Sequence, residues 1–132
     1  PYTLALDYIS PPDNDDIESA VAITDQDLPF RGQYSTYGAR SDASQDACGL
    51  SSQYGIWFSY STAASEQPLI LTATTDAQYD DIGIQSENAD GSFACVAQAG
   101  TSGSSIEWTA QGNVQYYILV GVNAPDMGIY FY

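Results

Sequence analysis

The chain has 132 residues, of which 44% are hydrophobic, so it is long enough for one domain with a substantial core. Its 17 acidic residues are opposed only by Arg31 and Arg40, with no lysine or histidine, which gives a formal net charge of −15. Nucleic acids and anionic membrane surfaces are bound by basic side chains, so the composition argues against both as partners, and no apolar run approaches the roughly 18 residues of a membrane span.

The first ten residues have the pattern of an extension strand. An apolar row alternates there with smaller or polar residues: Tyr2, Leu4, Leu6 and Tyr8. Pro11 and Pro12 follow, and two consecutive prolines cannot continue a strand ladder. We therefore expect residues 1–10 to form a separate N-terminal strand and residues 11–132 to form a single domain.

The remainder of the chain predicts strands, with one short exception. Residues 17–24 can form a helical turn, because Asp15 or Asp16 can cap it. Alternating apolar residues separated by Gly, Asn, Asp, Ser and Pro then mark strands at 30–37, 56–60, 69–73, 82–84, 93–97, 106–110, 116–122 and 129–131. Many short strands at this spacing predict an all-β fold, an antiparallel β-sandwich or jelly roll.

The two cysteines, Cys48 and Cys95, are most simply joined in one disulfide, as in small extracellular modules with many turns. The alternative is a pair of buried free thiols. Cys95 alternates with Phe93 and Ala97, and this spacing predicts that the three side chains share one inward face of their strand.

Seven segments resemble, in order and spacing, the bacterial pre-peptidase C-terminal (PPC) domain: PPDNDDIESAVAI, STYGARSDASQDACG, YGIWFSY, PLILTATT, YDDIGI, FACVAQ and YYILVGV. The resemblance covers residues 11–132. It implies a non-catalytic β-sandwich that is appended to secreted peptidases, adhesins and other surface proteins. Some members bind collagen or polysaccharide and some assist secretion, so we expect an extracellular or cell-surface location. Members often carry a cysteine where this chain has Ile17, so one variant disulfide is absent here.

An acidic cluster follows the two prolines and has the chemistry of a calcium site. Calcium takes six to eight oxygen ligands from carboxylates, amides and backbone carbonyls. Collagen-binding members of the PPC family place calcium where this linker meets an acidic loop, which implies the loop of Asp42 and Asp46. The resulting candidate ligands are Asn14, Asp15, Asp16, Glu18, Asp42 and Asp46. The alternative is a solvated linker and helix cap, and no other cofactor is expected.

Catalytic arrangements are scarce in this sequence. Without His or Lys, most pairings of a nucleophile with a base are unattainable. Asp80 and Asp81 are adjacent, and neighbours in a strand point to opposite faces, so the two carboxylates do not converge on one substrate. We therefore expect no catalytic residues and no enzymatic activity.

Two functions fit these features. The first is a structural or adhesive subunit that binds copies of itself head to tail through residues 2–9, and so forms a filament. The alternative to this donation is that residues 2–9 fold back and pair within their own domain. The second function is a carbohydrate- or matrix-binding accessory module of a larger secreted enzyme, which the 11 tyrosines and the two tryptophans favour. Trp57 and Trp108 lie in strand patterns, however, and are expected in the core more than on a sugar-binding surface.

Overall fold

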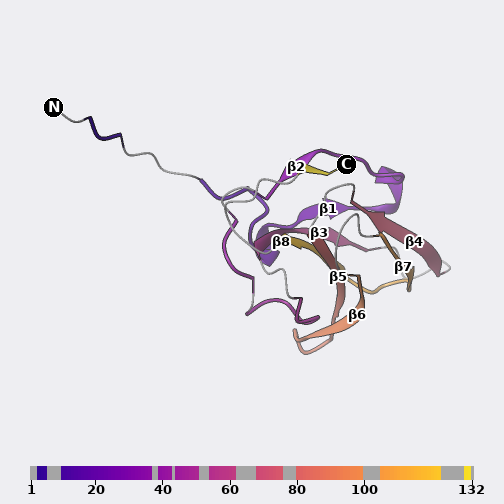
Figure 1. Ribbon diagram of the computed structural model, residues 1–132. Helices are drawn as coiled ribbons and strands as arrows, with labels where there is room; N and C mark the ends of the chain where they lie inside the picture. Colours follow the sequence, from indigo (N-terminus) through magenta and orange to yellow (C-terminus); the bar gives the residue numbers. More distant parts are fainter. Residues whose placement is uncertain are drawn as a thin grey trace.

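Strands dominate the computed structural model of the chain (Figure 1), which describes residues 3–5, 10–36, 39–42, 44–50, 54–61, 68–75, 80–99, 105–122 and 130–131. These residues contain strands and two 3₁₀ turns but no α-helix. The elements are η1 (Ile17–Ser19), β1 (Val21–Ile23), η2 (Asp25–Asp27), β2 (Tyr34–Ser35), β3 (Tyr54–Tyr60), β4 (Leu69–Thr74), β5 (Asp80–Glu87), β6 (Phe93–Ala99), β7 (Ser105–Ala110), β8 (Tyr116–Val122) and β9 (Tyr130–Phe131). The prediction of an all-β fold is confirmed.

The largest sheet has five strands in the order β1-β3-β8-β5-β6. Four of these strands pair antiparallel, whereas β1 runs parallel to β3. The sheet is therefore mixed, and the expectation of a purely antiparallel arrangement is wrong. A parallel pair needs a connection of a dozen or more residues, and the chain between Ile23 and Tyr54 is long enough to provide it. The helical turn predicted over residues 17–24 shrinks to Ile17–Ser19 because the β-branched residues after it join the sheet.

Two smaller sheets complete the described fold. β4 pairs antiparallel with β7, and β2 pairs antiparallel with β9. The strand predicted over residues 30–37 is reduced to Tyr34–Ser35.

Both faces of the five-stranded sheet are covered. On one face, side chains of β3, β5 and β8 form the main core together with β7, whose contributions are Ile106, Trp108 and Ala110. On the opposite face, Trp57 and Leu119 pack with Ile17 and Leu50. The side chains of β3 therefore alternate between two buried environments, as the sequence predicts.

A β-bulge in β6 changes which residues share a face. Ile84 is opposite Ala97, whereas the next residue, Gln85, is opposite Cys95, so Val96 is the extra residue. Paired residues lie on the same side of a sheet, so Cys95 and Ala97 lie on opposite faces. Phe93 and Cys95 share a face, as predicted, but Ala97 packs against the main core on the other side. The predicted common face of all three residues is therefore wrong, and Cys95 is exposed.

The predicted disulfide is confirmed. Cys48 and Cys95 are bonded, with their Cα atoms 4.8 Å apart, and no described cysteine is free. The bond ties the loop before β3 to β6, on the Trp57 face of the sheet, where Cys48 packs against the smaller core. A disulfide of this kind indicates an oxidising compartment.

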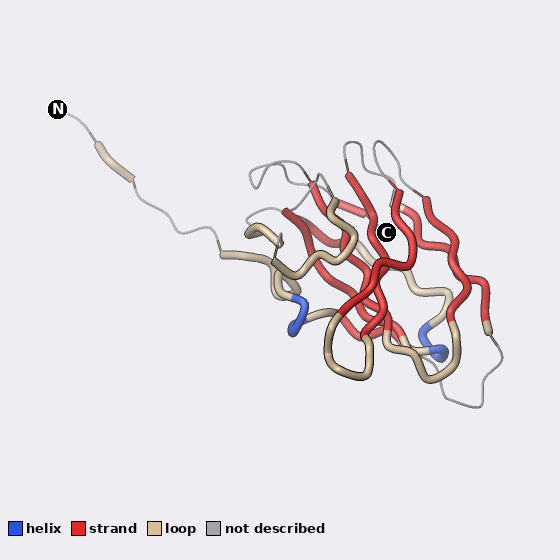
Figure 2. The backbone as a smooth tube through the Cα atoms, turned by 90° about the horizontal axis from the view of Figure 1, so that it is seen from below, coloured by secondary structure: helices blue, strands red, loops and turns tan. Residues whose placement is uncertain are grey.

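Residues 3–5 lie far from the sheets, as both Figure 1 and Figure 2 show. Leu4 is 81% exposed, the largest value among the exposed large hydrophobic side chains that the structure describes. Tyr2, Leu6 and Tyr8 lie outside the described residues. Among the helices of the described part of the chain, none is long and apolar enough to cross a membrane.

Candidate functional site

The linker after the two prolines is anchored to β3 through Asn14. The side-chain amide of Asn14 donates a hydrogen bond to the main-chain carbonyl of Trp57 at 3.0 Å. The main-chain N–H of Trp57 in turn donates to the carbonyl of Asn14 at 2.9 Å. Asn14 is only 4% exposed, so this pair of bonds is protected from water. The linker therefore follows the domain closely at this residue.

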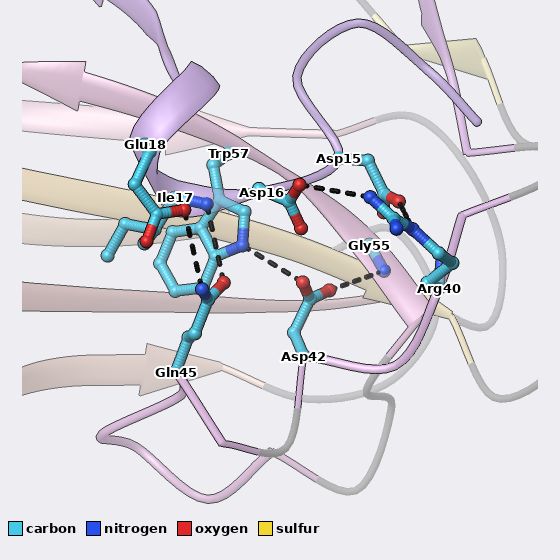
Figure 3. A network of polar contacts seen from close by, with 9 residues as sticks. All are labelled: Asp15, Asp16, Ile17, Glu18, Arg40, Asp42, Gln45, Gly55 and Trp57. Atoms are coloured by element: carbon cyan, nitrogen blue, oxygen red, sulfur yellow. Dashed lines mark hydrogen bonds and ion pairs between the residues drawn. The ribbon is translucent and has the colours of Figure 1, made fainter.

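Arg40 holds the next two residues of the linker, as Figure 3 shows. Its Nε lies 2.7 Å from a carboxylate oxygen of Asp15, and its Nη2 lies 2.9 Å from Asp16. The main-chain N–H of Arg40 also donates to Asp15 at 3.0 Å. Asp15 is buried, whereas the Arg40 side chain is 63% exposed. One of the two cations of the chain thus pairs with two carboxylates of the acidic linker.

Asp42 lies beneath this ion pair and supports β3. Its carboxylate accepts hydrogen bonds from the main-chain N–H of Gly55 at 2.9 Å and from Nε1 of Trp57 at 3.1 Å (Figure 3). Desolvation raises the pKa of Asp42 from 3.8 to about 7, the two hydrogen bonds oppose the rise, and the charges of Asp15 and Asp16 add to it. Asp42 is therefore a buried carboxyl that titrates near neutral pH.

Two more of the predicted ligands stabilise loops. Asp46 accepts hydrogen bonds from the main-chain N–H groups of Cys48 at 2.9 Å and Leu50 at 2.6 Å. Glu18 is exposed and accepts a 3.5 Å hydrogen bond from the side chain of Gln45. The carbonyl oxygen of that same side chain accepts from the N–H of Ile17 at 3.3 Å (Figure 3).

Of the six residues predicted for calcium, Asn14, Asp15 and Asp16 belong to the linker, Glu18 follows it, and Asp42 and Asp46 lie in the loop before β3. Each of the six forms hydrogen bonds with protein groups. Within the described ranges, no three acidic, histidine or cysteine side chains gather as a metal site would require. The calcium site stays a prediction. The sequence reasoning missed Arg40, Gln45 and Trp57 as partners of the linker. Arg40 carried a usable signal, because a rare cation in a chain of charge −15 is expected to have an acidic partner.

A second feature lies on the opposite face of the five-stranded sheet. It is an apolar groove of about 600 Å³, whose floor includes Phe58, Ile82, Ile118 and Val120. Trp108 of β7 also lines it. Its volume falls in the range of ordinary ligand pockets. We call it the β4 groove, because β4 forms one of its walls.

Two continuous segments of backbone form the walls of the β4 groove, and only one of them is a strand. Every residue from Ile70 to Thr75 lines one wall, and every residue from Leu28 to Gly32 lines the other. Consecutive residues of a strand point to alternate faces, so an unbroken run in the lining indicates that the groove follows the edge of β4. The other edge of β4 pairs with β7, and this edge has no strand partner among the described residues.

Two polar groups of the β4 groove lack partners in the described structure. Nε1 of Trp108 is buried and has no hydrogen-bond acceptor there. Arg31 is exposed in the wall of the groove and forms no ion pair with the described residues. Trp57 and Trp108 are 0% and 7% exposed, so neither offers an open ring face to a sugar.

No family model, curated protein or solved structure matches this chain. The resemblance to the PPC domain thus rests on the seven sequence segments alone. Three features of the described chain bear on its function: the anchored linker, the exposed residues 3–5 and the β4 groove.

Proposed function

We propose that the chain is a non-catalytic extracellular subunit that assembles head to tail with copies of itself, and that it forms a filament by donating its first strand to a neighbour. The observation that carries this proposal is the position of residues 3–5, which stand clear of the domain with Leu4 81% exposed. Leu4 belongs to the alternating row that also contains Tyr2, Leu6 and Tyr8. Each such side chain contributes about 1.5 to 3 kcal/mol when it is fully buried, so the row favours a partner that covers it.

The anchored linker supports donation to another copy. Pro11 and Pro12 stiffen the segment just before Asn14, and a proline-rich segment extends about 3.1 Å per residue. The bonds of Asn14, Asp15 and Asp16 then fix where this segment leaves the domain. A strand held in a defined direction loses less conformational entropy when it binds, which strengthens association.

A strand given by one copy and received by the next makes a head-to-tail contact, which either closes a ring or continues as a filament. The disulfide supports an oxidising, extracellular location. The core between the five-stranded sheet and the β4–β7 pair supports the finer assignment of a PPC-like β-sandwich. The lack of His and Lys supports a role without catalysis.

The test compares two double variants of the full chain that add the same negative charge. Leu4→Asp with Leu6→Asp places two carboxylates in the apolar row, and Thr3→Asp with Ala5→Asp places them on the other side of the strand. Thr3, Leu4 and Ala5 are all exposed in the isolated chain. Size-exclusion chromatography and negative-stain microscopy should show polymers for the natural chain and for the Thr3/Ala5 variant, but monomers for the Leu4/Leu6 variant.

A natural chain that stays monomeric overturns the proposal and favours the carbohydrate- or matrix-binding accessory module instead. Polymers that survive in the Leu4/Leu6 variant also overturn it, because the apolar row would then play no part in assembly.

A further inference from the structure

We propose that the β4 groove is the acceptor site, in which residues 2–9 of the neighbouring copy lie along the free edge of β4 as an added strand. This inference rests on the proposed function and names the surface that it needs.

The groove has the form expected for a single strand. An unpaired strand edge presents a row of N–H and C=O groups, which another extended backbone satisfies in register. The six residues of β4 span about 20 Å, and the eight residues 2–9 span about 26 Å when extended. Thus the incoming segment is long enough to pair with the whole of β4.

The side chains of the two partners are complementary. The alternating row of the first strand would face the floor of Phe58, Ile82, Ile118 and Val120, which belongs to the main core. Burial of the row against this floor would remove apolar surface of both partners from water, which is the main favourable contribution to association.

An ion pair would fix the register of the incoming strand along β4. In an added strand, Asp7 would face away from the apolar row, because successive residues of a strand point to opposite sides, so it would remain at the surface of the filled groove. Arg31 is exposed in the wall of that groove. Arg40, the other cation, is paired with the linker, whereas Arg31 forms no ion pair with the described residues and can therefore meet an incoming carboxylate.

The occupant is a second copy and not the strand of the same chain. Asn14 anchors the linker at Trp57, on the face of the five-stranded sheet that carries the smaller core. Phe58 and the rest of the groove floor belong to the opposite face. To fill its own groove, the strand would have to turn back and pass around the edge of the sheet, whereas residues 3–5 point away from the domain (Figures 1 and 2).

The first experiment locates the acceptor by cross-linking. The receiver is the full-length chain with Leu4→Asp and Leu6→Asp, which cannot donate its own strand. The probe is a synthetic peptide of residues 1–10 with photoleucine in place of Leu4. Mass spectrometry should place the cross-links within 28–32, 70–75 and the floor of the β4 groove, and excess unlabelled peptide should suppress them. Cross-links confined to other segments overturn the inference.

The second experiment tests the charge pair without disturbing the core. Arg31→Glu in the same receiver should weaken binding of the peptide about two- to fivefold, the range for one exposed ion pair, and a peptide with Asp7→Arg should restore it. Val96→Glu, at an exposed position of β6, is the matched control and should leave the dissociation constant unchanged. Equal binding by the Arg31 and Val96 variants, without rescue, contradicts the inference.

The two proposals fail in different ways. If the natural chain polymerises and the Leu4/Leu6 variant does not, but the cross-links lie outside the β4 groove, the acceptor is wrong and strand donation stands. If the natural chain does not polymerise, strand donation itself fails.

Discussion

Asp42 should make the stability of the domain depend on pH in an unusual direction. Its pKa is about 7 in the folded chain because burial disfavours the charged form, against an unperturbed value of 3.8. The folded state therefore binds a proton that the unfolded state releases between about pH 4 and pH 7. The contribution of Asp42 to stability is therefore greatest below this window, falls across it, and is lost once the pH has risen through about 7. This is the reverse of a carboxylate in a favourable ion pair.

The size of the effect follows from the two pKa values. Each tenfold change in proton affinity is worth about 1.4 kcal/mol, so the titration of Asp42 contributes about 4 kcal/mol between the ends of the window. Asp42 is 2% exposed, so water screens little of this effect. For a domain whose total stability is about 5 to 15 kcal/mol, the change is large.

The assay is urea unfolding at several pH values between 5 and 8, on the natural chain and on Asp42→Asn. The variant does not titrate, and its one side-chain oxygen can accept a hydrogen bond from either Gly55 or Trp57 but not from both. The donor left without an acceptor should lower the stability of the variant by about 1 to 3 kcal/mol at every pH. The other acidic residues also lose charge as the pH falls, and both proteins share that contribution. The natural chain should gain about 2 to 3 kcal/mol more than the variant on going from pH 8 to pH 5, because this range covers about two of the three pH units of the window. Parallel pH profiles for the two proteins would refute the reasoning.

Further changes test other parts of the structure. Arg40→Gln should lower the free energy of unfolding by about 1 to 3 kcal/mol, because it leaves the buried carboxylate of Asp15 without its cation. The control Arg31→Gln should change the free energy of unfolding by less than about 0.5 kcal/mol, and thermal melts compare the two variants. Gly55→Ala should cost about 1 to 3 kcal/mol or more in the same assay, since its Cβ would lie 2.7 Å from a Cα of β8 and force the strands apart. Reduction, or Cys48→Ser with Cys95→Ser, should cost about 4 kcal/mol for a bond that spans 47 residues, and an unchanged melting temperature would contradict this. The predicted calcium site is expected to raise the melting temperature when calcium is added after chelation, by the equivalent of about 2.7 kcal/mol at a hundredfold excess over Kd; no rise would mean that the acidic cluster only anchors the linker.

Local patterns in the sequence predicted the strands but not their arrangement. The alternation of Ile56, Phe58 and Tyr60 with Trp57 correctly separated two faces of β3, because a strand buried on both sides still has a period of two. The bulge at Val96 was not predictable, since one extra residue leaves composition and alternation almost unchanged. The parallel pairing of β1 was missed for a similar reason: three apolar residues carry no information about the direction of their partner.

The candidate site was predicted in part. The sequence identified the acidic linker and the loop around Asp42, which do lie together, and it identified the disulfide. The sequence did not reveal the hydrogen bond from Trp57 to Asp42, because that contact depends on how the loop packs against β3. The β4 groove was also out of reach, since its walls are segments about 40 residues apart that only the packed sheets bring together.

The two outer strands of the five-stranded sheet limit unwanted pairing between sheet edges of different copies. β1 has only three residues, and β6 is interrupted by the bulge at Val96. Short or irregular borders make poor templates for further pairing, so chance sideways stacking of these domains into amorphous aggregates is disfavoured. At high local concentration, the chain is then expected to remain dispersed unless a matching segment is presented in the right direction.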